Sequence, residues 1–135
     1  MLFKLNKTKA LETLLFVCNR LEVADKHKVS KILYHADKAH LENYGRMITG
    51  DKYVKMPHGP VPSWIYDVIK ENEKNPQVIQ VDGYNLKPLR EAKKEELSES
   101  DIACLTDSIK LWGTNLGIGK NEQEIYQEAV FKNIS

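Results

Sequence analysis

The chain has 135 residues, a length that suits one domain with a real hydrophobic core. Apolar residues make up 41% and charged residues 29%, a soluble globular balance that excludes an intrinsically disordered chain. Because 20 Lys and Arg nearly cancel 19 Asp and Glu, the net charge of +1 argues against nucleic acid as a partner.

Two amphipathic helices are predicted in the first third of the chain. In the first, over about 8–21, apolar residues recur at spacings of three and four. The second covers 26–44, with Asp25 as its expected N-cap. Gly45 is expected to end it, since glycine readily adopts the left-handed conformation found after many helices.

The segment 45–62, "GRMITGDKYVKMPHGPVP", interrupts this helical pattern. It holds three of the seven glycines and three of the five prolines. Proline fixes φ and glycine permits turns that other residues resist. Because periodic runs lie on both sides, the segment is predicted to be a shaped loop between two core helices.

Further elements follow in the second half of the chain. A third helix should begin with Ser63 as its cap and end before Asn75, which precedes a proline. A short hairpin is expected over 78–89, where Asp82-Gly83 suits a type I′ turn with positive φ at both central residues.

The C-terminal part is predicted to add two more helices. One should be capped by Ser98 or Ser100 and stopped by Gly113, after Trp112. A last helix should begin at about Asn121. The predicted fold is therefore a single domain, 1–135, mainly α with a minor β part: a compact helical domain of about five helices with one short β-hairpin.

The sequence also predicts a cytoplasmic protein without membrane contact. Lysines interrupt any apolar signal-peptide core near the N-terminus, and no apolar stretch is long enough to span a bilayer. Cys18 and Cys104 lie in helical apolar patterns and belong to no CxxC pair. Both are expected to be buried free thiols in a reducing compartment.

Asp37 and His40 are the strongest candidates for chemistry in the residue pattern. They lie three residues apart on one face of the second helix, beside its apolar stripe. One interpretation is a hydrolase or metal enzyme in which Asp37 orients the imidazole, with His58 as a further candidate. The other, which we favour, is a buried hydrogen-bonded pair that ties the helix to a neighbouring loop. No second ligand cluster occurs, so neither metal nor cofactor is expected.

A DNA-binding autoregulator built on the first two predicted helices is a further alternative. The near-zero net charge argues against it, because DNA affinity depends largely on positive charge opposite the phosphates.

The segment 31–69 carries the most specific pattern, "KILYHADKAHLENYGRMITGDKYVKMPHGPVPSWIYDVI". It resembles the Panacea domain, also called the SocA-like antitoxin domain, which occurs in phage-associated proteins. A later "LSESDIACL" extends the resemblance to about residue 112. The matching positions are Lys31, Leu33, Tyr34, Ala36, Asp37, His40, Tyr44, Gly45, Ile48, Tyr53, Gly59, Pro60, Val61 and Tyr66.

One departure from the family pattern lies at the C-terminus. Members commonly carry a histidine element followed by a tryptophan there, whereas 113–135 contains neither residue. This part of the chain is therefore expected to be divergent, and no role of that histidine is carried over.

The resemblance implies a non-catalytic antitoxin without a cofactor. Such proteins neutralise a cognate toxin, often encoded by an adjacent gene, through direct protein–protein contact. One kind also acts as an adaptor that delivers the toxin to a cytoplasmic protease.

Two groups of site residues follow. The partner-binding candidates share a position in or next to the Gly/Pro segment and are Lys52, Tyr53, Lys55, Met56, His58 and Trp64. The residues expected to hold the motif together are Tyr34, Asp37, His40, Tyr44, Gly45, Gly59, Pro60, Val61 and Tyr66. For Tyr53 and Pro60-Val61, closure of the core over Asp37 and His40 is the favoured alternative.

Overall fold

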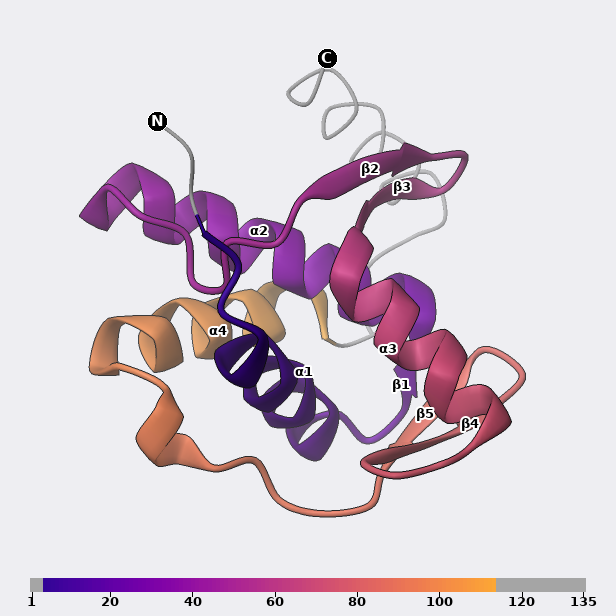
Figure 1. The fold of residues 1–135 in the computed structure, drawn as a ribbon. Coiled ribbons are helices and arrows are strands. Elements are labelled where there is room, and N and C mark those ends of the chain that lie inside the picture. Colours follow the sequence, from indigo (N-terminus) through magenta and orange to yellow (C-terminus); the bar gives the residue numbers. More distant parts are fainter. Residues whose placement is uncertain (1–3, 114–135) are drawn as a thin grey trace.

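The computed structural model describes residues 4–113 and shows four helices with two small antiparallel sheets (Figure 1). The mainly helical α+β fold class is therefore confirmed. In chain order the elements are α1 (Lys7–Arg20), β1 (Ala24–Asp25), α2 (Lys26–Tyr44), β2 (Tyr53–Met56), β3 (Gly59–Pro62), α3 (Ser63–Lys74), β4 (Ile79–Asp82), β5 (Asn85–Pro88), a 3-10 turn (Lys94–Glu96) and α4 (Glu99–Trp112).

Helix α1 forms the centre of the core. Figure 1 shows it in front of α2 and α4, which lie side by side, with α3 next to it. Leu14, Leu15 and Phe16 are almost fully buried, and so are Ile32 of α2 and Leu105 of α4. Burial of such side chains is the main stabilising term of the fold.

A polar contact also holds α1, on the side where the chain passes from β5 to α4. The Glu12 carboxylate accepts two hydrogen bonds from the Arg90 guanidinium, both of 2.8 Å, and one from the Lys93 backbone N–H, also of 2.8 Å. The hydrogen bonds from Arg90 lower the pKa of Glu12, although burial opposes them. This bidentate pair fixes the connecting segment, which Figure 1 shows passing beneath α1.

Both predicted ends of α2 are confirmed. The Asp25 side chain accepts a hydrogen bond of 2.7 Å from the Lys28 N–H, as an N-cap does. Gly45 has a φ of 75° and donates its N–H to the Leu41 carbonyl, 3.0 Å away. The start of α4 is also as predicted, since Ser98 and Asp101 form a capping box.

The predicted hairpin over 78–89 is present as β4–β5, but its turn differs. Asp82 pairs with Asn85, so the central residues are Gly83 and Tyr84. Only Gly83 has positive φ, 62°, whereas a type I′ turn needs positive φ at both central positions. The expected Asp82-Gly83 type I′ turn is therefore wrong by one residue. Strand β1 joins β5 to complete a three-stranded sheet.

The Gly/Pro segment forms a second hairpin, which the sequence analysis treated as a loop. Strands β2 and β3 pair from Tyr53 with Pro62 to Met56 with Gly59. Proline lacks the N–H that a central strand needs, which is why such a segment does not look like a strand. Two-stranded pairing tolerates Pro60 and Pro62 because each strand has one edge outside the ladder.

The predicted N-cap of α3 is wrong. Ser63 is the first residue of α3 and caps nothing, since Pro62 occupies the N-cap position without a side-chain bond. The helix ends before Asn75, as predicted. The last helix expected from Asn121 and the divergent C-terminal region lie outside the described residues.

The described helices give two further facts about the chain. None of them is both long and apolar enough to cross a membrane. Cys18 and Cys104 are buried free thiols, as expected. Burial raises the pKa of Cys18 to about 12, so its thiol stays protonated.

Candidate functional site

An apolar groove lies between α2, the β2–β3 hairpin and α3, with a volume of about 210 Å³. We call it the α2–α3 groove. Helix α2, the β2–β3 hairpin and α3 contribute most of its residues, and Tyr84 comes from the turn between β4 and β5. Its lining residues are Lys26, His27, Val29, Ser30, Lys31, Tyr34, His35, Met56, Pro57, His58, Gly59, Pro60, Val61, Pro62, Ile65, Tyr66, Ile69 and Tyr84.

Three histidines, His27, His35 and His58, line the groove. Burial lowers the pKa of His35 to about 4, and the positive charges of Lys38 and Lys31 act in the same direction. Burial, with Lys31, also lowers the pKa of His27. The rings of His27 and His58 lie across from one another, with their centroids 6.1 Å apart. At neutral pH His27 and His35 therefore add polar but uncharged edges to an apolar surface.

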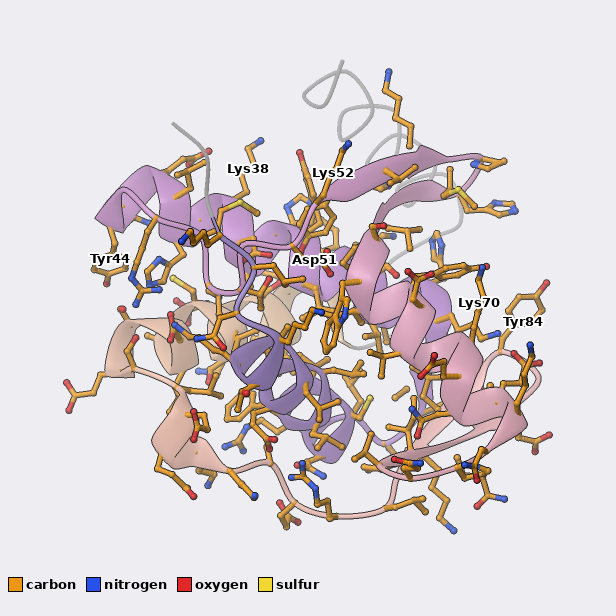
Figure 2. All side chains as sticks on the ribbon, in the orientation of Figure 1. Lys38, Tyr44, Asp51, Lys52, Lys70 and Tyr84 are labelled. Atoms are coloured by element: carbon orange, nitrogen blue, oxygen red, sulfur yellow. The ribbon has the colours of Figure 1, made fainter. Side chains whose placement is uncertain are left out.

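Of the six predicted partner-binding residues, two line this groove and four do not. Met56 (38% exposed) and His58 stand at the tip of the hairpin and reach the groove. Lys52, just before β2, and Lys55 within it are exposed but do not line the groove. Figure 2 shows Lys52 pointing away from the body of the molecule. The hairpin thus presents an apolar side to the groove and positive charge elsewhere.

The other two candidates, Tyr53 and Trp64, are partly buried. The Tyr53 hydroxyl donates a hydrogen bond of 2.6 Å to the Asp37 carboxylate, and its ring meets the Tyr34 ring edge-on at 5.3 Å. Trp64 packs against the hydrophobic core. Both side chains already have structural contacts, and a partner contact at either one stays a prediction.

Asp37 is 3% exposed and anchors the segment that follows α2. Besides the bond from Tyr53, its carboxylate accepts the Ile48 backbone N–H at 2.8 Å. Burial raises the pKa of Asp37 to about 6, although these hydrogen bonds act in the opposite direction. A second cavity, of about 290 Å³, lies beside Asp37 and is lined by Tyr34, Asp37, Lys38, Leu41, Glu42, Met47 and Tyr53.

His40 is fully buried and contacts a different set of groups. Its Nδ1 lies 2.7 Å from the Arg46 carbonyl oxygen, which can only accept, so Nδ1 carries a proton. Its Nε2 lies 2.8 Å from the Ser100 hydroxyl and 3.2 Å from Asp101 Oδ1. His40 therefore joins the residues after α2 to the start of α4.

Asp37 and His40 do not form the pair that the sequence analysis expected. They have no hydrogen bond to each other, and the prediction of a single Asp–His unit is wrong. Each nevertheless ties α2 to the segment after it, Asp37 through Ile48 and His40 through the Arg46 carbonyl. Their spacing places both residues on one face of the helix. The segment after α2 folds back over this face and offers each of them a different partner.

Asp51 is a buried anchor that the sequence analysis missed. Its carboxylate accepts the backbone N–H groups of Trp64 at 2.9 Å and Ile65 at 3.0 Å, in the first turn of α3. It also accepts the Lys52 N–H at 2.8 Å. A carboxylate at a helix N-terminus satisfies orphan donors and the helix dipole together. No local signal marks it, because it acts on a helix that begins twelve residues later.

The remaining motif residues divide between the groove and the far end of α2. Tyr34, Gly59, Pro60, Val61 and Tyr66 all line the groove. By contrast, Tyr44 is 56% exposed and its ring lies 4.7 Å from that of His40, next to Gly45. Within residues 4–113 no group of three His, Cys, Asp or Glu side chains could hold a metal ion.

Comparison with known protein families gives one match. The model described as "Antitoxin SocA-like, Panacea domain" matches residues 29–116, which include α2 from Val29 onward, both hairpins, α3 and α4. Comparison with curated proteins and with solved structures gives no significant match.

Proposed function

Because the chain belongs to the SocA-like antitoxin family with the Panacea domain, we propose that it neutralises a cognate toxin by direct protein–protein binding. The observation that carries the proposal is the extent of the family match. It includes every lining residue of the α2–α3 groove except Lys26 and His27. The toxin is proposed to be encoded by an adjacent gene.

The proposed binding surface is the β2–β3 hairpin with the groove beneath it. Met56 and His58 expose apolar and polar atoms at the hairpin tip, and Lys52, just before β2, and Lys55 within it add positive charge. The hairpin is anchored through Asp51 and Asp37, so little conformational entropy is lost when a partner binds it.

The experiment that tests the function uses the neighbouring genes. Each neighbour is expressed alone and together with this chain, and growth is followed. We expect one neighbour to arrest growth alone, growth to recover on co-expression, and the two proteins to co-purify. If no neighbour is toxic, or if a toxic one is rescued without forming a complex, the proposal fails.

Neutralisation is proposed to be non-catalytic. Asp37 and His40, the candidates for chemistry, both make buried hydrogen bonds that hold the fold together. A binding antitoxin abolishes toxin activity at a fixed molar ratio, whereas an enzyme would act far below stoichiometry. Titration of purified toxin with this chain separates the two, and turnover at a hundredth of the toxin concentration would contradict binding as the mechanism.

Delivery of the bound toxin to a protease is a further part of the proposal, since one kind of SocA-like antitoxin is expected to act as such an adaptor. The toxin half-life in cells should then shorten when this chain is co-expressed. An unchanged half-life with restored growth would leave simple sequestration as the mechanism.

A further inference from the structure

The α2–α3 groove combines an apolar surface with positive charge. Its walls are mainly apolar, with Ile65 and Ile69 from α3 and Val61 from β3. Lys26 and Lys31 of α2 line it as well, and no carboxylate does so among the described residues. A ligand that complements this surface is apolar and carries a negative charge.

The volume of the groove limits what can enter it. Drug-sized ligands and cofactors occupy pockets of about 300–1,000 Å³, whereas a cavity of about 150 Å³ holds a benzene molecule. A groove of about 210 Å³ therefore suits one large aromatic side chain. A single buried aromatic anchor, often Trp or Tyr, is typical of the energetic centre of a protein–protein interface.

Lys31 is the cation placed to select such a ligand. Its side chain is about half buried, and its ammonium lies 5.8 Å from the centre of the Trp112 ring. Burial lowers the pKa of Lys31, although the nearby Asp25 carboxylate acts in the opposite direction, and a carboxylate of the ligand would add to this stabilisation of the charged form. Lys26 also lines the groove, and the Glu73 carboxylate lies 3.7 Å from its ammonium.

We propose that the groove receives one aromatic side chain of the partner protein, next to a carboxylate that pairs with Lys31. This inference rests on the proposed function, since the partner is taken to be the cognate toxin. The charge excludes a basic segment as the occupant, and the volume excludes a large cofactor. The toxin surface that binds here is therefore aromatic and acidic.

The steric test fills the groove from α2. Ser30 lines it, is half-buried and makes none of the hydrogen bonds described above, so Ser30→Phe should occupy the space with little effect on the core. We expect it to weaken toxin binding at least about thirty-fold, the loss of one hot-spot anchor. The matched control is Asn43→Phe, an exposed position near the other end of the same helix, which should bind the toxin as wild type does.

The charge test compares two lysines on the same helix. Lys31→Gln should weaken toxin binding about five- to ten-fold and reduce its salt dependence. Lys38→Gln is the control, because Lys38 lines the other cavity and points outward in Figure 2. Equal effects of the two variants, or toxin affinity unchanged in both Ser30→Phe and Lys31→Gln, would overturn the proposal.

A probe that needs no toxin makes the inference independent of the proposed function. Binding of 3-phenylpropionate and of 3-phenylpropionamide to the full chain is followed by amide chemical shifts. The carboxylate probe should shift residues 27–34 and 58–66 and bind several-fold more tightly than the amide, and Lys31→Gln should abolish that difference. Failure of both probes to shift these residues overturns the groove assignment even if a toxin is found.

The combined results separate the possible failures. If the probes bind as expected but no neighbouring gene product is toxic, the antitoxin function is wrong and the groove chemistry stands. If wild type neutralises a toxin and Ser30→Phe does so equally well, the toxin binds elsewhere. If Ser30→Phe converts a dimer of this chain to a monomer, the occupant is a second copy and the proposal is overturned.

Discussion

The two hairpins are attached to the two ends of α3 by different chemistry. At the N-terminal end, the ionisable carboxylate of Asp51 accepts N–H groups from the first turn of the helix. At the C-terminal end, the neutral amide of Asn72 accepts the N–H groups of Gln77 at 2.8 Å and Val78 at 3.0 Å, leading into β4. Both side chains are buried.

The helix dipole explains why the two anchors differ. Negative charge is stabilising at a helix N-terminus and destabilising at a C-terminus, so a carboxylate suits only the first position. The β2–β3 hairpin, which forms one wall of the groove, therefore depends on buried acids, Asp51 and Asp37. The β4–β5 hairpin depends on an uncharged side chain. Of the two hairpins, only β2–β3 should respond strongly to substitution of its charged anchors and, through Asp37, to pH.

The largest expected effect is loss of the charged anchor. Asp51→Ala leaves three backbone N–H groups without their acceptor, two of them at the start of α3, and should lower the free energy of unfolding by about 4 kcal/mol. Urea unfolding measures it. The control is Asp82→Ala in the other hairpin, an exposed side chain whose loss should change stability by about 0.5 kcal/mol or less. A cost for Asp51→Ala below about 1 kcal/mol would show that the carboxylate is not an anchor.

The two hairpins also differ in how far they could be predicted from sequence. The β4–β5 hairpin was found because its turn signal is local, although the turn lies one residue later than expected. The β2–β3 hairpin was missed because its prolines suppress the strand signal. Asp51 was missed because a cap that acts from thirteen residues away in sequence leaves no local pattern, and Ser63 offered a plausible local substitute.

The candidate site was predictable in part. Of the nine motif residues expected to act together, five line one groove, and the other four, which include Asp37 and His40, do not line it. The groove itself could not be predicted, because it exists only where α2 and α3 face each other across the hairpin. Asp37 and His40 were correctly placed at the helix face that the following segment covers, but their separate partners depend on the path of that segment.

The second effect, in order of size, is a pH dependence that comes from Asp37, which holds the β2–β3 hairpin through Tyr53. The ordinary pKa of Asp37 is 3.8 and its folded pKa is about 6, so the folded state holds the proton more tightly than the unfolded state does. Its contribution to the free energy of unfolding therefore falls as pH rises from about 4 to about 6, by about 3 kcal/mol. Asp37→Asn should remove this loss.

The measurement is urea unfolding of wild type and Asp37→Asn between pH 4 and pH 7. Comparison with the variant is needed because His35 acts in the opposite direction. Its folded pKa of about 4 lies below its ordinary 6.5, so its contribution rises over the same range. The difference in stability between variant and wild type should grow with pH. A difference that stays constant would contradict a raised pKa at Asp37.

The neutral anchor should give a smaller effect without a titration. Asn72→Ala removes the acceptor for the start of β4 and should cost about 2 kcal/mol at every pH between 4 and 7. Asn72→Asp sharpens the comparison. A carboxylate near the C-terminus of α3 should lower the free energy of unfolding by about 1 kcal/mol at neutral pH, and protonation of this carboxylate at low pH should restore it. If Asn72→Asp were more stable than wild type at pH 7, the dipole account of the two anchors would be wrong.

The smallest effect compares the turn glycines of the two hairpins. A Cβ added at Gly59 or Gly83 would meet nothing within 4 Å, so only the backbone conformation distinguishes them. Gly83, with a φ of 62°, occupies the left-handed helical region, where an Ala costs about 1 kcal/mol. Gly59, with a φ of 123°, lies outside that region, and Gly59→Ala should cost about 2 kcal/mol. Urea unfolding of both variants gives the difference.

Gly59→Ala should also move the amide signals of the groove, because Gly59 joins the hairpin tip to β3, whereas Gly83→Ala should leave most of them in place. Equal costs would mean that the β2–β3 hairpin relaxes around the new side chain, and the groove wall would then be less rigid than its two buried acids imply.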